Sequence, residues 1–84
     1  MKNIDNIVSD FMDAIDPTRK MKVIVTGPNN SHYLLITIQW EYRTMTIEVL
    51  QTRSGEFINP AQLNLFGFTH AEGDRMMERF VNLL

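Results

Sequence analysis

Residues 32–51 read HYLLITIQWEYRTMTIEVLQ, and this stretch decides the fold. It contains two runs, His32 to Trp40 and Thr44 to Gln51, in which apolar and polar side chains alternate. Alternation with a period of two is typical of a β-strand that buries one face. The two runs therefore predict a pair of antiparallel strands joined by a hairpin turn.

Only one register of this hairpin places the apolar side chains of both runs on the same face. The pairs that it forms are Leu34 with Val49, Ile36 with Ile47 and Ile38 with Met45. A slip of one residue would turn half of these side chains into water. The segment Trp40-Glu41-Tyr42-Arg43 offers no Gly or Asn for a tight turn, so we expect a four-residue loop.

Met21 to Thr26, which is rich in β-branched side chains, predicts a third strand before the hairpin. A cluster of turn formers, Gly27-Pro28-Asn29-Asn30-Ser31, separates it from the next strand. One face of the resulting meander is continuously apolar. That face carries Met21, Val23, Val25, Leu34, Ile36, Ile38, Met45, Ile47 and Val49.

Helical periodicity flanks the strands at both ends of the chain. From Ile4 to Ile15 the apolar residues recur at spacings of three and four, Asn3 or Asp5 can cap the start, and Asp16-Pro17 ends the helix. Thr69 and Glu72 form a capping box that predicts the start of a last helix. The stripe expected to be buried on that helix is Met76, Met77, Phe80, Val81 and Leu84.

The stretch between the strands and the last helix is ambiguous. Asn59-Pro60 is a start signal for a short helix that would end at Gly67, whereas Phe57-Ile58 could briefly continue the sheet. Leu65 to Phe68 could also be extended. The predicted fold class is α+β: helix, three-stranded antiparallel meander, short helix or turn, and C-terminal helix, with both long helices on one sheet face. Residues 1–84 are expected to form a single domain.

Composition narrows the classes of protein to which the chain could belong. Its 84 residues are 44% hydrophobic, which favours a folded core over intrinsic disorder. The absence of cysteine argues against a disulfide scaffold or thiolate chemistry and predicts a reducing, cytoplasmic setting. Met1 to Asp5 lacks an uninterrupted apolar leader, and no apolar run approaches a membrane span. A net charge of −2 disfavours nucleic acid as a partner.

Candidate catalytic groups are few. His70 and Asp74 stand one helical turn apart, but two ligands do not make a metal site, and His32 has no evident partner. The loop after Gly27 lacks the lysine and the multiple glycines of a phosphate-binding loop, and no serine has a nucleophile-elbow context. We therefore expect no enzyme, cofactor or metal, with a small enzyme that uses His70 and Asp74 as one alternative.

Gly27-Pro28 followed by His32, within the order helix, three strands, helix, resembles double-stranded RNA-binding domains, which place a Gly-Pro-x-His loop there. Those domains open their second helix with a lysine cluster that grips phosphate. Here residues 69–74 contain no lysine, so the resemblance implies a shared topology. An RNA-binding alternative would rely on the phosphate contacts Lys20, Lys22, Arg43 and Arg53.

The leading hypothesis is a non-enzymatic protein-binding module, such as a small inhibitor, immunity or accessory protein that blocks a larger partner. A small secretion-type chaperone is an alternative of the same class. One candidate surface is the acidic ridge of the first helix, Asp5, Asp10, Asp13 and Asp16, which could steer onto a basic nucleic-acid-binding protein.

The second candidate surface is the outer sheet face, which is only half polar. Tyr33, Leu35 and Leu50 should cluster there with Ile24, Thr37, Thr46 and Glu48. This face could bind a partner or a second copy of the chain as a homodimer. The alternative is that Phe57 or the segment from Asn59 to Phe68 folds back and covers it.

Overall fold

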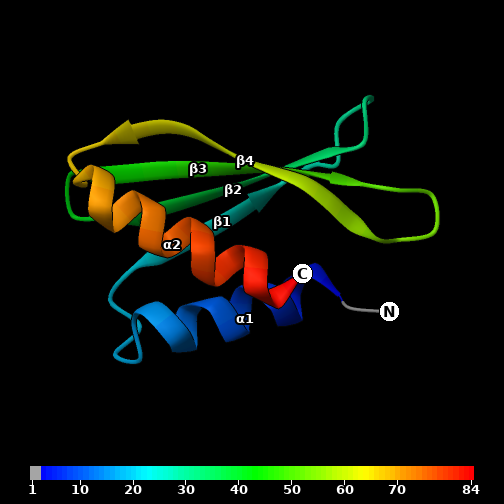
Figure 1. The fold of residues 1–84 in the computed structure, drawn as a ribbon. Coiled ribbons are helices and arrows are strands. Elements are labelled where there is room, and N and C mark those ends of the chain that lie inside the picture. The colour runs from blue at the N-terminus through cyan, green and yellow to red at the C-terminus, as the bar shows by residue number, and fades with distance from the viewer. Residues whose placement is uncertain (1–2) are drawn as a thin grey trace.

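The computed structural model describes residues 3–84 and shows two helices packed on one side of a four-stranded antiparallel sheet (Figure 1). The elements are α1 (Ile4–Ile15), β1 (Lys22–Thr26), β2 (Tyr33–Trp40), β3 (Arg43–Gln51), β4 (Phe57–Phe66) and α2 (His70–Leu83). The strand order is β1-β2-β3-β4, so each strand pairs with the next along the chain. Met1 and Lys2 lie outside the described residues. They belong to the segment from Met1 to Asp5 in which no apolar leader was expected.

The register expected for the central hairpin is confirmed. Ile36 pairs with Ile47, and the flanking pairs Leu34 with Val49 and Ile38 with Met45 follow. All six side chains are at most 2% exposed, so they form the floor of the core. In β1, Val23 and Val25 face the same way and are partly buried against it. A period of two with β-branched side chains is thus sufficient to determine which face the helices cover.

The loop between β2 and β3 differs from the expectation of four residues. Trp40 pairs directly with Arg43, which leaves only Glu41 and Tyr42 in the turn. Glu41 takes a φ of +58°, the left-handed conformation that a tight hairpin turn needs and that Gly or Asn usually supplies. The Arg43 guanidinium lies 4.1 Å from the centroid of the Trp40 ring. This cation–π contact favours continued pairing up to the turn.

The expected three-stranded sheet is corrected to four strands, because residues 59–66, left open between a short helix and an extended segment, form most of β4. Opposite β3, the strand carries an extra residue twice, between Ile58 and Ala61 and again between Leu63 and Phe66. Asn59 and Asn64 lie at these bulges with φ of +54° and +51°. Asparagine tolerates this conformation better than most residues, so it permits both bulges.

Pro60, which appeared to begin a helix, is compatible with this strand. β4 is the edge of the sheet, where a residue without an amide hydrogen is tolerated, and Pro60 stands beside the first bulge. The same bulges reverse the direction of the side chains that follow. Phe57 and Leu65 pack on the core, whereas Ile58 and Phe66 are exposed on the opposite face.

Both helices begin, and α1 ends, where the capping signals predict. The Asn3 side chain accepts a hydrogen bond from the Asp5 amide at 2.7 Å. The capping box of α2 is complete, with the Glu72 amide donating to Thr69 Oγ1 at 3.1 Å and the Thr69 amide donating to Glu72 Oε1 at 2.8 Å. In the predicted stripe of α2, Met76 and Phe80 are buried, but Val81 is 45% exposed and was wrongly assigned to it.

Gly73 sets how closely α2 approaches the sheet edge. A Cβ atom at this position would lie 3.1 Å from both Gln62 Oε1 and Leu65 Cδ1 on β4. The buried glycine therefore lets the helix pack against the inner face of β4. Within residues 3–84, neither helix has the length and apolarity that crossing a membrane requires.

Candidate functional site

The outer face of the sheet, opposite the helices, is the first candidate surface. The structure brings the three residues expected there together: Tyr33 lies directly opposite Leu50, and Leu35 is two residues along the same strand. Ile24 of β1 stands opposite Thr37, which in turn stands opposite Thr46 of β3. The predicted cluster is therefore a continuous surface that crosses three strands.

β4 extends this surface by one strand. Ile58 lies opposite Leu50, and Leu63 lies opposite Thr46. Phe66 lies opposite Thr44 at the far end. We call the apolar members of this face the outer patch, and they are Ile24, Tyr33, Leu35, Leu50, Ile58, Leu63 and Phe66. The sequence reasoning did not assign the last three to this face, because Ile58 was expected only to continue the sheet briefly and the stretch from Asn59 to Phe68 was left open between a short helix and an extended segment.

No described segment covers the outer patch. Both helices lie on the other side of the sheet (Figure 1), and the stretch from Asn59 to Phe66, which could have folded over the patch, instead pairs beside β3. Ile24 is 48% exposed, Ile58 38% and Phe66 65%. The patch also carries polar groups: Thr37 and Thr46 form a hydroxyl pair at 3.5 Å, and Glu48 stands opposite Leu35.

The acidic ridge is the second candidate surface, and half of it has a structural role. Asp13 forms an ion pair with Arg19 at 2.5 Å. Asp16 accepts hydrogen bonds from the Thr18 hydroxyl and the Met21 amide, both at 2.6 Å, and so fastens the turn after α1. These bonds, the Thr18 one foremost, hold the pKa of Asp16 below its ordinary value. Asp5 and Asp10 remain exposed and unpaired within residues 3–84.

The ridge and the outer patch face in opposite directions. α1 turns Ile7, Phe11 and Met12 toward the core, so Asp10 and Asp13 point away from the sheet on the helical side of the molecule. The outer patch lies on the other side of the sheet (Figure 1). Because the whole helical layer separates them, the two surfaces do not combine into one contiguous site.

The four cations considered for RNA binding do not form a patch either. Arg43 lies on the helical side, with its guanidinium enclosed by the rings of Trp40, Tyr42 and Phe68 and its side chain only 19% exposed. Lys22 is next to Gln39 at one end of the sheet, whereas Arg53 lies in the turn beyond the opposite end. Phosphate binding normally needs such charges along one surface.

The histidines are both exposed at the ends of elements. His32, with a φ of +67°, precedes β2, and its amide donates to the Asn29 carbonyl at 3.0 Å. His70 begins α2, one turn before Asp74. Between residues 3 and 84 there is no group of three or more His, Asp or Glu side chains that could hold a metal ion.

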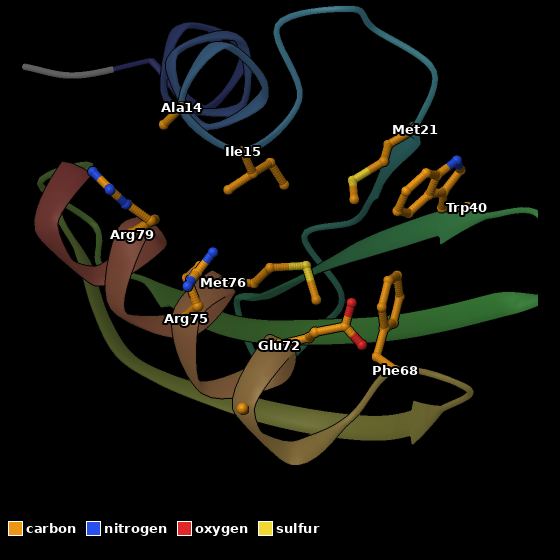
Figure 2. A pocket seen from close by; sticks show the side chains of 10 residues that line it. Ala14, Ile15, Met21, Trp40, Phe68, Glu72, Arg75, Met76 and Arg79 are labelled. Carbon is orange, nitrogen blue, oxygen red and sulfur yellow. The ribbon is translucent and has the colours of Figure 1, made fainter.

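A pocket of about 340 Å³ lies on the helical side, between the end of α1, the first turns of α2 and the end of β2 (Figure 2). Apolar side chains line most of it, including Met21, Trp40, Phe68 and Met76. Arg75 and Arg79 extend from successive turns of α2 toward α1 at its mouth (Figure 2). The sequence reasoning missed this pocket, since its lining comes from segments that are distant along the chain.

The chain was compared with protein-family models, with curated proteins and with solved structures, and none of the three comparisons finds a match. Function must therefore be argued from the surfaces themselves.

Proposed function

We propose that this chain is a non-enzymatic protein-binding module that docks a larger partner through the outer patch. An inhibitor, an immunity protein and an accessory protein are all of this kind. The observation that carries the proposal is the uncovered sheet face with three large apolar side chains, Ile24, Ile58 and Phe66, at 48%, 38% and 65% exposure. An exposed apolar patch of this kind, rimmed by polar residues, is typical of interaction surfaces.

The stability of the isolated chain does not account for this arrangement. Ile24 and Phe66 lie on the face away from the core, so folding buries them only in part. Complete burial of such a side chain is worth about 1.5–3 kcal/mol, and here much of that free energy is still available for association. A threonine at either position would suit an exposed strand equally well, so the strand itself does not require these apolar side chains.

The polar groups within the patch favour a separate partner that associates reversibly over a permanent dimer. Thr37, Thr46 and Glu48 interrupt the apolar side chains across β2 and β3. Obligate dimer interfaces resemble a protein core, whereas reversible interfaces are about as polar as ordinary protein surface. Glu48 can give such a partner a charged contact that fixes its orientation.

The other functions considered from the sequence receive less support. A secretion-type chaperone would use the same patch, and only the nature of the partner separates it from an inhibitor. RNA binding would require Lys20, Lys22, Arg43 and Arg53 to act together, but Arg43 is enclosed by aromatic rings. Catalysis by His70 and Asp74 would need a third group, and no such cluster occurs in residues 3–84.

The proposal is tested by affinity capture from the native cell followed by binding measurements on the captured protein. The Ile24→Ser/Phe66→Ser variant should bind it at least ten-fold more weakly than the parent. The matched variant Asp10→Lys/Asp13→Lys, on the opposite side of the molecule, should retain the affinity. The reverse pattern would move the site to α1. A dimer of the isolated parent that the first variant dissociates would instead identify a second copy as the occupant.

A further inference from the structure

The pocket beneath α1 and α2 has the size and lining of a small-molecule site. Its volume of about 340 Å³ is at the lower end of the range for ligand pockets. Ile15 of α1, Trp40 of β2 and Met76 of α2 form three of its walls (Figure 2). Met21, just before β1, and Phe68, between β4 and α2, complete the lining.

Apart from the Glu72 carboxylate, which lies between Met76 and Phe68 (Figure 2), the interior of this pocket is apolar and adaptable. Met21 and Met76 place flexible thioether side chains beside the rings of Trp40 and Phe68 (Figure 2). Methionine fills irregular space and adjusts to different apolar groups, and aromatic faces provide large contact areas. An aliphatic chain would replace water against these four side chains, and that exchange is favourable.

The mouth of the pocket is cationic. Arg75 and Arg79, one helical turn apart on α2, have no ion-pair partner within residues 3–84. Glu72 also lines the pocket, and its carboxylate interacts electrostatically with Arg75. Glu72 Oε1 accepts a hydrogen bond from the Thr69 amide in the capping box, which is the main reason that the pKa of Glu72 is lowered. The two guanidinium groups outnumber this one carboxylate, and their forked donors suit a further carboxylate, which each of them can bind through two hydrogen bonds.

We propose that this pocket binds a small amphipathic monocarboxylate, of the class of a medium-chain fatty acid. Its carboxylate pairs with Arg75 and Arg79, and its aliphatic chain lies against Met21, Trp40 and Met76. The cationic mouth of the pocket is complementary in charge to the carboxylate, and its apolar side chains are complementary to the aliphatic chain. The site lies on the opposite side of the sheet from the outer patch, so it is independent of protein docking there.

Trp40, the only tryptophan in the chain, reports directly on occupancy. Titration with octanoate, followed by Trp40 fluorescence, should give a saturable change below the concentration at which octanoate forms micelles. Octanol, which has the same chain without the charge, should bind about ten-fold more weakly, and acetate should produce no change. If octanoate gives no saturable change, or octanol binds as tightly as octanoate, the proposal is wrong.

Two variants establish that the bound molecule lies in this pocket. Arg75→Gln/Arg79→Gln should weaken octanoate binding about ten-fold while leaving octanol binding unchanged, and the control Arg53→Gln, in the distant β3–β4 turn, should change neither. Ala71→Leu, which fills the pocket from α2, should weaken both ligands. Octanoate binding that persists unchanged in the arginine variant and in Ala71→Leu would place the ligand elsewhere and overturn the proposal.

Discussion

Phe11 of α1 and Phe80 of α2 meet edge to face, with ring centroids 5.7 Å apart and planes at 86°, and neither ring is exposed. This contact joins the first helix to the last above the buried face of the sheet. Edge-to-face pairs add about 0.5–1.5 kcal/mol to the free energy gained from burial alone. The two ends of the chain therefore contribute jointly to one core.

Truncation of Phe80 should cost far more than truncation of its neighbour. Phe80→Ala removes a completely buried ring and is expected to lower the free energy of unfolding by about 3–5 kcal/mol. The control Val81→Ala, at a residue that is 45% exposed, should change it by about 0.5 kcal/mol or less. Urea unfolding followed by circular dichroism measures both. Similar losses for the two variants would mean that α2 packs with a different face.

The second bulge of β4 should depend on the conformation of Asn64 rather than on its side chain. Asn64→Ala places a residue that disfavours positive φ at +51° and should destabilise the protein by about 1 kcal/mol. Asn64→Gly should cost at most a few tenths of a kcal/mol, because glycine adopts this conformation readily. Chemical unfolding of both variants is the test, and an equal loss for alanine and glycine would contradict it.

The lowered pKa of Asp16 predicts part of the acid sensitivity of the fold. Since the carboxyl is more acidic in the folded than in the unfolded state, its stabilising effect is complete above the unfolded pKa. That effect is lost as the pH falls from about 4 through the lower folded value. Unfolding free energies measured across this range should fall less steeply for Asp16→Asn than for the parent. An equal slope in the variant and the parent would contradict this prediction.

The central hairpin and α1 could be predicted because a single periodicity runs through each of them without interruption. In β2 and β3 every second side chain is apolar, and only the pairing of Ile36 with Ile47 buries them all. The length of the turn could not be predicted, because Glu41 adopts a positive φ that its residue type does not suggest. At this turn, the pairing and stacking between Trp40 and Arg43 outweigh the preference of Glu41 for a negative φ.

β4 could not be predicted because its bulges break the alternation that identifies strands. Asn59 and Pro60 match a helix start locally, and only the available edge of β3 turns the segment into a strand. The outer patch was for that reason found only in part: Tyr33 and Leu35 were assigned to it, but Ile58 and Phe66 were not. The two asparagines, five residues apart and both able to adopt positive φ, are the signal that could have indicated a doubly bulged strand.

The acidic ridge shows why a charge pattern alone does not define a binding surface. Four carboxylates along α1 suggested an interaction site, because fold stability gave no evident reason for them. The structure supplies a reason for two of them, since Asp13 pairs with Arg19 and Asp16 binds the Met21 amide. Arg19 and Met21 both follow α1 in the sequence. The turn that brings them close to the helix has no regular pattern of apolar residues from which it could be predicted.

Methyl cross-saturation NMR on the complex with the captured partner tests the central claim, that the outer patch is the docking surface, most directly. When the partner is saturated, the methyl signals of Ile24 and Ile58 should lose intensity, because these groups lie on the proposed interface. The methyl signals of Val81, exposed on the helical side, should keep theirs. Loss of intensity at Val81 with Ile24 and Ile58 unaffected would contradict the account and place the partner on the helices.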